Sequence, residues 1–187
     1  MANYNDLDRL IYLVSKNHIE NYHLYHTNIL EVNSCEGKYV SWLNELLYTN
    51  NYYCTSKSDV VVKKNNEKIG ESKNIKFIKG DINKTPLPIE SCGIIIANFK
   101  TNKPYHNISQ KALQNIYKSL HRNGLCIIIA KTKPTEKYFN ELYSRIITKK
   151  ENIRPLLKNE KTFQKAGYSK ADIFYKNLNT TGYILMK

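Results

Sequence analysis

Long apolar runs are missing from this sequence, and none approaches the ~20 consecutive apolar residues that a helix needs to span a bilayer. The residues from Met1 to Asn5 also lack the pattern of a secretory signal peptide. The four cysteines, Cys35, Cys54, Cys92 and Cys126, include no C-x-x-C pair, which excludes the zinc, iron–sulfur and redox motifs built on such pairs. These absences predict a cytoplasmic protein that has no metal site and no membrane contact.

Acidic residues are scarce as well. The 187 residues include 16 Asp and Glu against 29 Lys and Arg, which gives a net charge of +13. Such an excess is typical of proteins that bind nucleic acid or acidic partners. The lysines are scattered and are accompanied by many asparagines, so we prefer to interpret them as solvated surface. A functional basic surface that binds nucleic acid is the alternative.

Hydrophobic periodicity divides the chain into helices and strands. Helices are expected at 6–20, 38–47, 59–68, 109–121, 135–147 and 161–166. Strands are expected at 28–32, 52–55, 75–78, 94–97, 125–130, 173–175 and 182–186. Ser58 is a good N-cap for the third helix, Asn123-Gly124 is expected to form a left-handed C-cap after the fourth, and Gly167 is expected to end the last helix.

Strands alternate with helices along most of the chain. This order predicts an α/β fold with a Rossmann-like, mostly parallel seven-stranded sheet and helices on both faces. The last two strands have no helix between them, so we expect an antiparallel C-terminal strand pair. We expect a single domain over 1–187, in which residues 1–27 form a helical extension that packs on the core.

The first turn from strand to helix is the expected location of a ligand, because ligands in such sheets bind at the carboxyl ends of the strands. The chain there reads Ile29-Leu30-Glu31-Val32-Asn33-Ser34-Cys35-Glu36-Gly37. This stretch resembles the first motif of class I S-adenosylmethionine methyltransferases, which is an apolar strand, an acidic residue and a glycine-rich turn.

The resemblance continues in the same order down the chain and covers roughly residues 28–187. Its further segments are Tyr52–Ser58, Gly80-Asp81, Leu87-Pro88, Ser91–Phe99, Ala112–Ala130, Phe163–Gly167 and Tyr183–Met186. In this order they are similar to the family's second strand, the residues after the third strand that contact adenine, a proline-containing loop, the fourth strand, and the helix and strand that follow. The last two segments together are similar to the C-terminal end of the family's domain.

The resemblance implies S-adenosylmethionine as the cofactor. We assign no catalytic side chain and expect no metal ligand. The cofactor-binding positions that it implies are Glu31, Asn33, Cys35, Gly37, Ser56, Asp81 and Asn98. Three of these residues also have a purely structural interpretation, with Glu31 as a helix partner, Asp81 as a loop cap and Gly37 as a turn glycine. His106 is expected to be solvent-exposed, and Trp42 is expected to serve core or helix packing.

Four positions depart from the family's pattern. Asn33 and Cys35 stand where the first two glycines would be. Asn tolerates positive φ, whereas a thiol fills space that the methionine moiety needs. Ser56 replaces the carboxylate that binds the ribose, and Gly93 replaces an acidic residue at the start of the fourth strand. Since charged hydrogen bonds contribute ~1.5–3 kcal/mol each, loss of the pair that a carboxylate makes would weaken binding by roughly two decades or more.

These departures favour a methyltransferase-like domain with an eroded S-adenosylmethionine site, which acts as a non-catalytic protein-interaction module. The fold pattern and the segment Ala112–Ala130 resemble the N-terminal domain of anamorsin-type proteins, which implies a protein partner and a role in cytosolic iron–sulfur cluster assembly. One alternative is an active S-adenosylmethionine-dependent methyltransferase with an unknown acceptor. Another is a basic nucleic-acid-binding module, whose affinity would depend strongly on salt.

Overall fold

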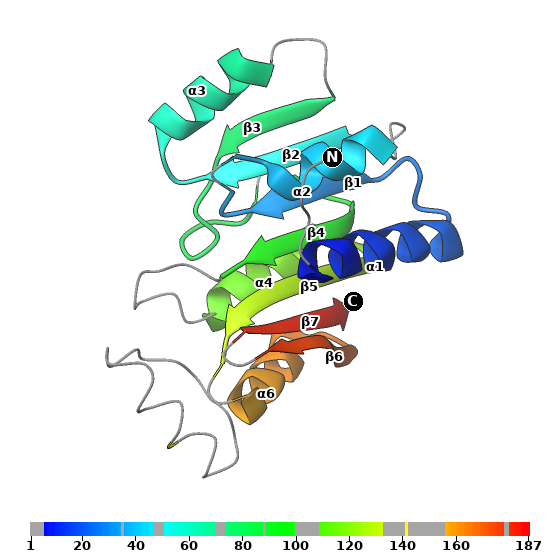
Figure 1. The fold of residues 1–187 in the computed structure, drawn as a ribbon. Helices are drawn as coiled ribbons and strands as arrows, with labels where there is room; N and C mark the ends of the chain where they lie inside the picture. The colour runs from blue at the N-terminus through cyan, green and yellow to red at the C-terminus, as the bar shows by residue number, and fades with distance from the viewer. Residues whose placement is uncertain are drawn as a thin grey trace.

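A seven-stranded mixed sheet forms the centre of the molecule, in the order β3-β2-β1-β4-β5-β7-β6 (Figure 1). The computed structural model describes residues 6–34, 36–46, 51–69, 74–87, 89–99, 109–132, 141, 156–177 and 180–187. The strands are β1 Asn28–Val32, β2 Asn51–Ser56, β3 Ile75–Lys79, β4 Cys92–Asn98, β5 Leu120–Lys131, β6 Lys170–Asn177 and β7 Thr180–Met186. The helices are α1 Asp6–Tyr22, α2 Lys38–Leu46, α3 Asp59–Ile69, α4 Gln110–Ser119 and α6 Leu156–Ala166.

Five strands run parallel, and the last two close the sheet as a hairpin. Strands β1 to β5 pair in parallel, β7 pairs antiparallel with β5, and β6 pairs antiparallel with β7. This topology confirms the predicted fold class, including the antiparallel C-terminal strand pair. The expected helix at 135–147 lies outside the described residues except for Glu141.

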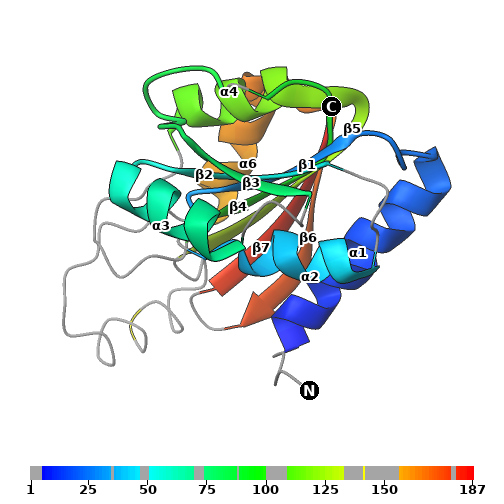
Figure 2. The same ribbon diagram turned by 90° about the horizontal axis from the view of Figure 1, so that it is seen from above.

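Helices cover both faces of the sheet. Figure 2 shows α4 and α6 on one face and α1, α2 and α3 on the other. Strand β1 alternates between the two cores, since Leu30 packs on the α4 side and Ile29 on the α1 side. The residues of β4 from Cys92 to Ala97 are buried, which confirms the prediction from the apolar run Ile94–Ala97. Among the described helices, none combines the length and apolarity that a membrane crossing requires.

Most helix ends follow the predicted chemistry, with one correction. The Ser58 hydroxyl accepts from the Val61 amide at the start of α3, and Gly167 ends α6 with φ +106°. The left-handed C-cap at Asn123-Gly124 was predicted wrongly, because neither residue has positive φ and both lie inside β5. Gly124 is needed for space instead, since a Cβ there would lie 2.7 Å from the Cys92 carbonyl oxygen.

Helix α1 contacts β4, β5 and α2. Its Tyr12 packs against Trp42 of α2 with ring centroids 4.7 Å apart, so Trp42 serves helix packing, as expected. His18 Nε2 lies 2.7 Å from the carbonyl oxygen of Asn123 in β5. These contacts join the N-terminal helix to α2 at one point and to the sheet at another.

Candidate functional site

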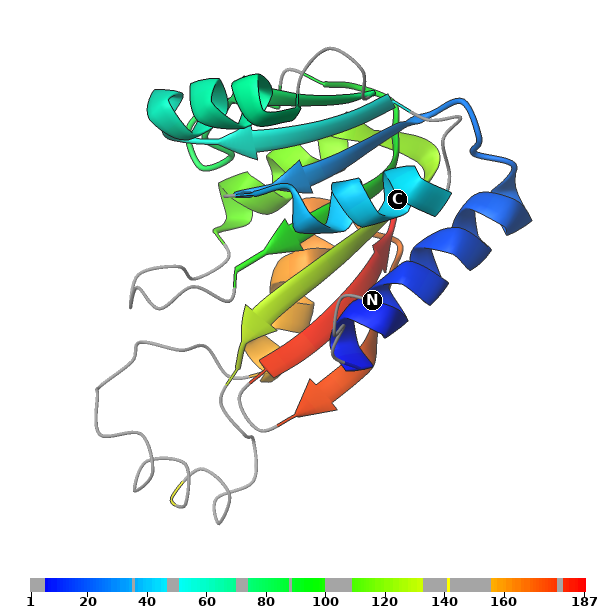
Figure 3. The same ribbon diagram turned by 45° about the horizontal axis from the view of Figure 1, so that its top comes forward.

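The carboxyl ends of the parallel strands lie along one edge of the sheet, where the arrowheads of β1, β2, β4 and β5 stand in a row (Figure 3). The strand order changes direction between β1 and β4, which are neighbours in the sheet although β2 and β3 follow β1 in the chain. Ligands in open α/β sheets bind beside such a switch point. The turns that follow β1, β2, β3 and β4 therefore define the candidate site.

The turn after β1 has the backbone conformation that small residues provide. Asn33 has φ +59° and Gly37 has φ +67°. Asn adopts this left-handed region more readily than most residues, so Asn33 takes the shape of the turn without a glycine. A Cβ at Gly37 would lie 2.9 Å from both Cys54 Sγ and Phe77 Cζ. Gly37 is therefore a packing glycine under the turn. Cys35 lies outside the described residues.

Glu31 fixes the start of α2. Its Oε2 accepts hydrogen bonds from the backbone amides of Tyr39 at 2.9 Å and Val40 at 3.2 Å. These amides are among the donors that an α-helix leaves without an intrahelical partner. Burial raises the pKa of the Glu31 carboxyl, while the hydrogen bonds it receives act in the opposite direction. In the described structure Glu31 thus acts as the helix partner that one of the two interpretations anticipated.

Backbone hydrogen bonds bring the three turns together. The Ser34 amide donates to the Thr55 carbonyl oxygen at 2.9 Å, and the Gly80 amide donates to that of Ser56 at 3.0 Å. Ser56 is buried at the end of β2, and its hydroxyl accepts from the Ser58 amide at 3.4 Å. Asn33, Ser56 and Asp81, three of the predicted positions, therefore lie on adjacent turns of one edge.

Asp81 caps the loop after β3 and pairs with a lysine that sequence reasoning missed. Asp81 Oδ1 accepts from the Asn83 amide at 3.0 Å and lies 3.2 Å from Lys57 Nζ. Burial alone would raise the pKa of Asp81, but the bonds from Asn83 and Lys57 outweigh it, so its pKa is lowered. Lys57 directly follows Ser56, which is the only signal in the sequence that it borders the site.

Hydrogen bonds from α4 and its N-cap hold the loop after β3. The side-chain amide of Asn115 donates to the carbonyl oxygens of Ile82 at 2.7 Å and Thr85 at 3.0 Å. The Ser109 hydroxyl, which caps α4, donates to Asn83 Oδ1 at 2.8 Å. Asn115 is buried. Its hydrogen bonds mean that α4, which follows β4 in the chain, helps to set the shape of the loop that carries Asp81.

The remaining predicted positions fall in different places. Asn98 ends β4, next to Ile129 of β5, and therefore lies on the candidate edge. Gly93 lies near the opposite end of β4, where a Cβ would come within 2.1 Å of Thr27 Oγ1. An acidic residue at Gly93 would not fit, and this end of β4 lies away from the candidate edge. His106 lies outside the described residues.

The amino edge of the sheet carries a separate hollow. An open pocket of about 500 Å³ is lined by Asn28, Leu87, Ile89, Glu90 and Ser91. Asn28 begins β1 and Ser91 precedes β4, so this pocket lies at the other end of the strands from Asn33 and Asn98. Within the described part of the chain, no three His, Cys, Asp or Glu side chains gather to hold a metal ion.

Comparison with known proteins gives a consistent set of relatives. A family model described as a methyltransferase domain matches residues 30–128. The carboxy-S-adenosyl-L-methionine synthase of Staphylococcus epidermidis is 21% identical over 207 aligned positions, which cover 98% of this chain and 87% of that protein.

Solved structures share the fold at low identity. A SAM-dependent methyltransferase from Aquifex aeolicus has a TM-score of 0.65 and 17% identity, covering 92% of this chain and 88% of its own. The structure of PigF with SAH has a TM-score of 0.64 and 17% identity, covering 87% of this chain and 51% of its own. The present chain therefore spans about half the length of PigF.

Proposed function

Since residues 30–128 place the chain in the family of class I S-adenosylmethionine-dependent methyltransferase domains, we propose that it is an active methyltransferase that binds this cofactor at the carboxyl edge of its sheet. The observation that carries the proposal is the turn after β1. Asn33 takes the left-handed conformation, and Glu31 orders the start of α2 beneath it. Asn33 therefore provides a left-handed backbone at a position where the family pattern has a glycine.

The polar atoms at this edge fit a nucleoside cofactor. Thr55 Oγ1 is buried and has no hydrogen-bond partner among the described residues. Asp81 uses Oδ1 for Asn83 and Lys57, and the described residues offer no partner to its Oδ2. The Ser56 hydroxyl accepts one bond and keeps its own proton for another acceptor. These donors and acceptors match the hydroxyl and amino groups that a nucleoside presents.

The chain's own residues would hold and orient the cofactor. Asn33 and the following turn would face the methionine moiety, Ser56 the ribose and the Asp81 loop the adenine, with Asn98 beside the reacting end. S-adenosylmethionine, when bound, supplies an electrophilic methyl group on a sulfonium. Positioning of the acceptor against such a group provides much of the catalysis, so an assigned general base is not required.

Two of the relatives support a cofactor of this class. The Staphylococcus epidermidis protein is a carboxy-S-adenosyl-L-methionine synthase, and the PigF structure was solved with SAH. Both favour the active interpretation over the non-catalytic one. An interaction module in iron–sulfur cluster assembly stays a prediction, as does a protein or nucleic-acid partner. Ser56 and the Lys57–Asp81 pair are the features that support an eroded site.

Calorimetry with S-adenosylmethionine and S-adenosylhomocysteine tests the proposal directly. We expect binding in the micromolar range for the full chain, and absence of binding would overturn the proposal. Ser56→Asp restores a carboxylate at the ribose position and should tighten binding about tenfold, the ~1.4 kcal/mol of one charged hydrogen bond.

Ser58→Asp is the matched control for that variant. It adds the same charge two residues away and retains an N-cap residue for α3. Equal affinity changes in the two variants would show that net charge, and not a ribose contact at Ser56, controls binding. Improved affinity in Ser56→Asp alone would place the ribose beside β2.

A further inference from the structure

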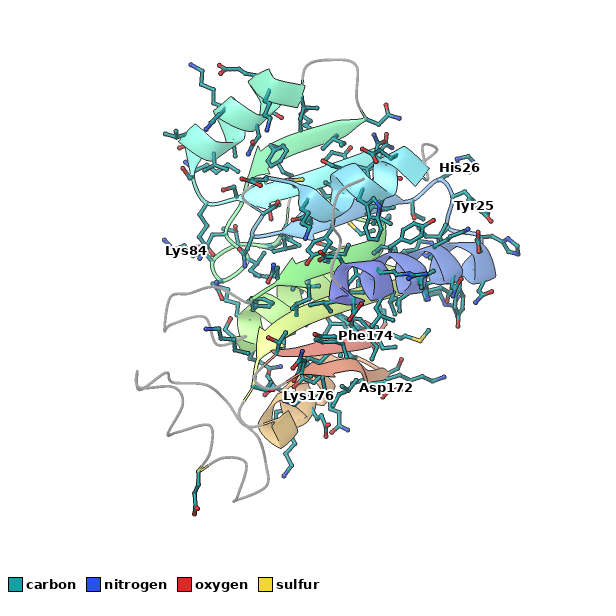
Figure 4. All side chains as sticks on the ribbon, viewed as in Figure 1. Tyr25, His26, Lys84, Asp172, Phe174 and Lys176 are labelled. Atoms are coloured by element: carbon teal, nitrogen blue, oxygen red, sulfur yellow. The ribbon has the colours of Figure 1, made fainter. Side chains whose placement is uncertain are left out.

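A second polar cluster lies on the same edge of the sheet, beyond the cofactor turns. It consists of Lys176 in β6, Thr132 directly after β5 and Thr181 in β7. Lys176 Nζ donates to Thr132 Oγ1 at 2.7 Å and to Thr181 Oγ1 at 3.0 Å. The two threonine oxygens lie 2.6 Å apart. Figure 4 labels Lys176 toward the arrowhead of β6, so three separate segments contribute to one small group.

The strand register places this Lys–Thr cluster beside the end of β4. Asn98 pairs with Ile129 of β5, and the next residue of β5, Ala130, pairs with Thr181, which pairs in turn with Lys176. Neighbouring strands are ~4.8 Å apart, so Thr181 lies two strands, or roughly 10 Å, from the line of β4. The cluster therefore lies on the side of Asn98 away from the turns after β2 and β3.

The hydrogen bonds of the cluster leave donors without acceptors. The Lys176 ammonium has three N–H groups, of which two go to the threonines. One threonine hydroxyl donates to the other, so the second hydroxyl proton and the third N–H remain. No other partner of these atoms is found among the described residues, so the group presents two donor protons and a positive charge, against one lone pair left on the threonine that donates.

Lys176 also has no acidic partner among the described residues. Within the described residues the ion pairs join Lys16 to Glu20, Lys38 to Asp8, Lys57 to Asp81 and Lys79 to Asp59, and none involves Lys176. Thr132 and Thr181 are fully buried, and the partial burial of the lysine lowers its pKa. Lys176 itself is exposed, so an incoming anion would compensate its charge and accept its third N–H, while the buried threonines hold the ammonium in place.

We propose that Lys176, Thr132 and Thr181 form a subsite that binds a carboxylate or phosphate group of the methyl acceptor. That the subsite binds an anion is argued from the cluster alone. That the anion belongs to the methyl acceptor rests on the proposed methyltransferase function. A charge-assisted hydrogen bond is about twice as strong as a neutral one, which suits the lysine to selecting an acidic substrate. The subsite thus narrows the acceptor to small molecules that carry an acidic group.

NMR titration of the full chain with inorganic phosphate and with benzoate, at constant ionic strength, tests the subsite. We expect saturable shifts of the Lys176 side chain and of the Thr132 and Thr181 amides. Lys176→Gln should weaken the binding at least tenfold, and Thr181→Val about threefold. Lys170→Gln, an exposed lysine of the same strand, is the matched control and should leave the affinity unchanged.

Each outcome of the titration decides the subsite. Tighter binding of phosphate or of benzoate identifies the acidic group, whereas equal losses in Lys176→Gln and Lys170→Gln would reduce the effect to overall charge and overturn it. Shifts that never saturate would overturn it as well. Calorimetry with S-adenosylmethionine reports separately on the cofactor. Anion binding without cofactor binding would retain the anion site and remove its assignment to a methyl acceptor.

Discussion

Gly37 and Asn33 both have positive φ in the same turn, but for different reasons. Asn33 adopts a left-handed backbone because asparagine tolerates positive φ better than most residues. At Gly37 the backbone is left-handed and the space is also filled, because Cys54 and Phe77 approach from below. The first of these positions accepts a side chain, whereas the second excludes even a methyl group.

We therefore expect Gly37→Ala to destabilise the protein by about 2–4 kcal/mol, combining backbone strain with overpacking. For a chain of this size that loss corresponds to a melting temperature roughly 5–15 °C lower, as measured by thermal denaturation. Gly80→Ala is the control, since its Cβ would meet Thr55 at an ordinary 3.4 Å without positive φ. Similar stability of the two variants would contradict this account.

The residues of the candidate site divide by how local their partners are. The turn at Asn33 was predictable, because a left-handed Asn depends on its own side chain. Lys57 and Lys176 were not, because their partners are set by strand neighbours far along the chain, Asp81 and Thr132. Gly93 was misjudged from alignment alone, since its environment is formed by Thr27 in the loop before β1.

At the scale of single elements, α2 depends on a residue outside itself. Glu31 in β1 binds the first free amides of the helix, and Lys38 of the helix pairs with Asp8 of α1. A helix of nine residues is marginal alone, so these contacts from its neighbours hold it in place. The contacts of Glu31 and Lys38 therefore also fix the end of the turn that borders the proposed cofactor position.

Glu31→Ala should cost about 3 kcal/mol, because it leaves two buried amides without an acceptor. Glu31→Gln retains a carbonyl oxygen and should lose less than half as much. Urea denaturation measures both losses, and calorimetry should show weaker S-adenosylmethionine binding in the same order. If the alanine and glutamine variants are equally stable, the helix does not depend on the Glu31 acceptor.

Element boundaries were predicted best where a side chain marks them. Ser58 and Gly167 mark ends of α3 and α6, and both were read from the sequence. The end of α4 was misread because Asn123-Gly124 has the composition of a C-cap, whereas the chain passes from Ser119 directly into β5. Gly124 is selected there by the approach of the Cys92 carbonyl, a contact from another strand.

For the molecule as a whole, the alternation of strands and helices was enough to predict the fold class. Buried runs such as Ile94–Ala97 and the uninterrupted final strand pair carried most of that information. The layout of polar groups along the sheet edge was not accessible in this way. Registers such as Lys176 opposite Thr181 depend on pairing between strands, and the bulge of β6 near Phe174 adds an offset that no local pattern indicates.

The packing of α1 on the sheet should make stability depend on pH. Burial lowers the pKa of His18, whose ring donates to the Asn123 carbonyl. As pH falls below the ordinary value of 6.5, the unfolded chain binds a proton before the folded one does. The contribution of His18 is therefore complete above about pH 6.5 and is lost as pH falls toward the lower folded pKa.

Melting temperatures between pH 7.5 and 5 test this dependence. His18→Gln should flatten the decline on the acid side, whereas His26→Gln, which changes an exposed histidine in the loop before β1, should leave the decline unchanged. A decline of the same steepness in the His18 variant would assign the acid sensitivity to other groups.

Asp81 already shares its charge with Lys57 through Oδ1, so a nucleoside that binds Oδ2 meets a carboxylate whose charge is partly neutralised. The lysine side chain is 44% exposed, and ions at 0.1 M screen charges beyond about 10 Å and weaken such a pair further as they become more concentrated. Uncharged adenosine should therefore bind better in concentrated salt than in dilute buffer. The affinity for a phosphate ligand would instead fall as the salt concentration rises, so the dependence of binding on ionic strength would distinguish a nucleoside from a phosphate.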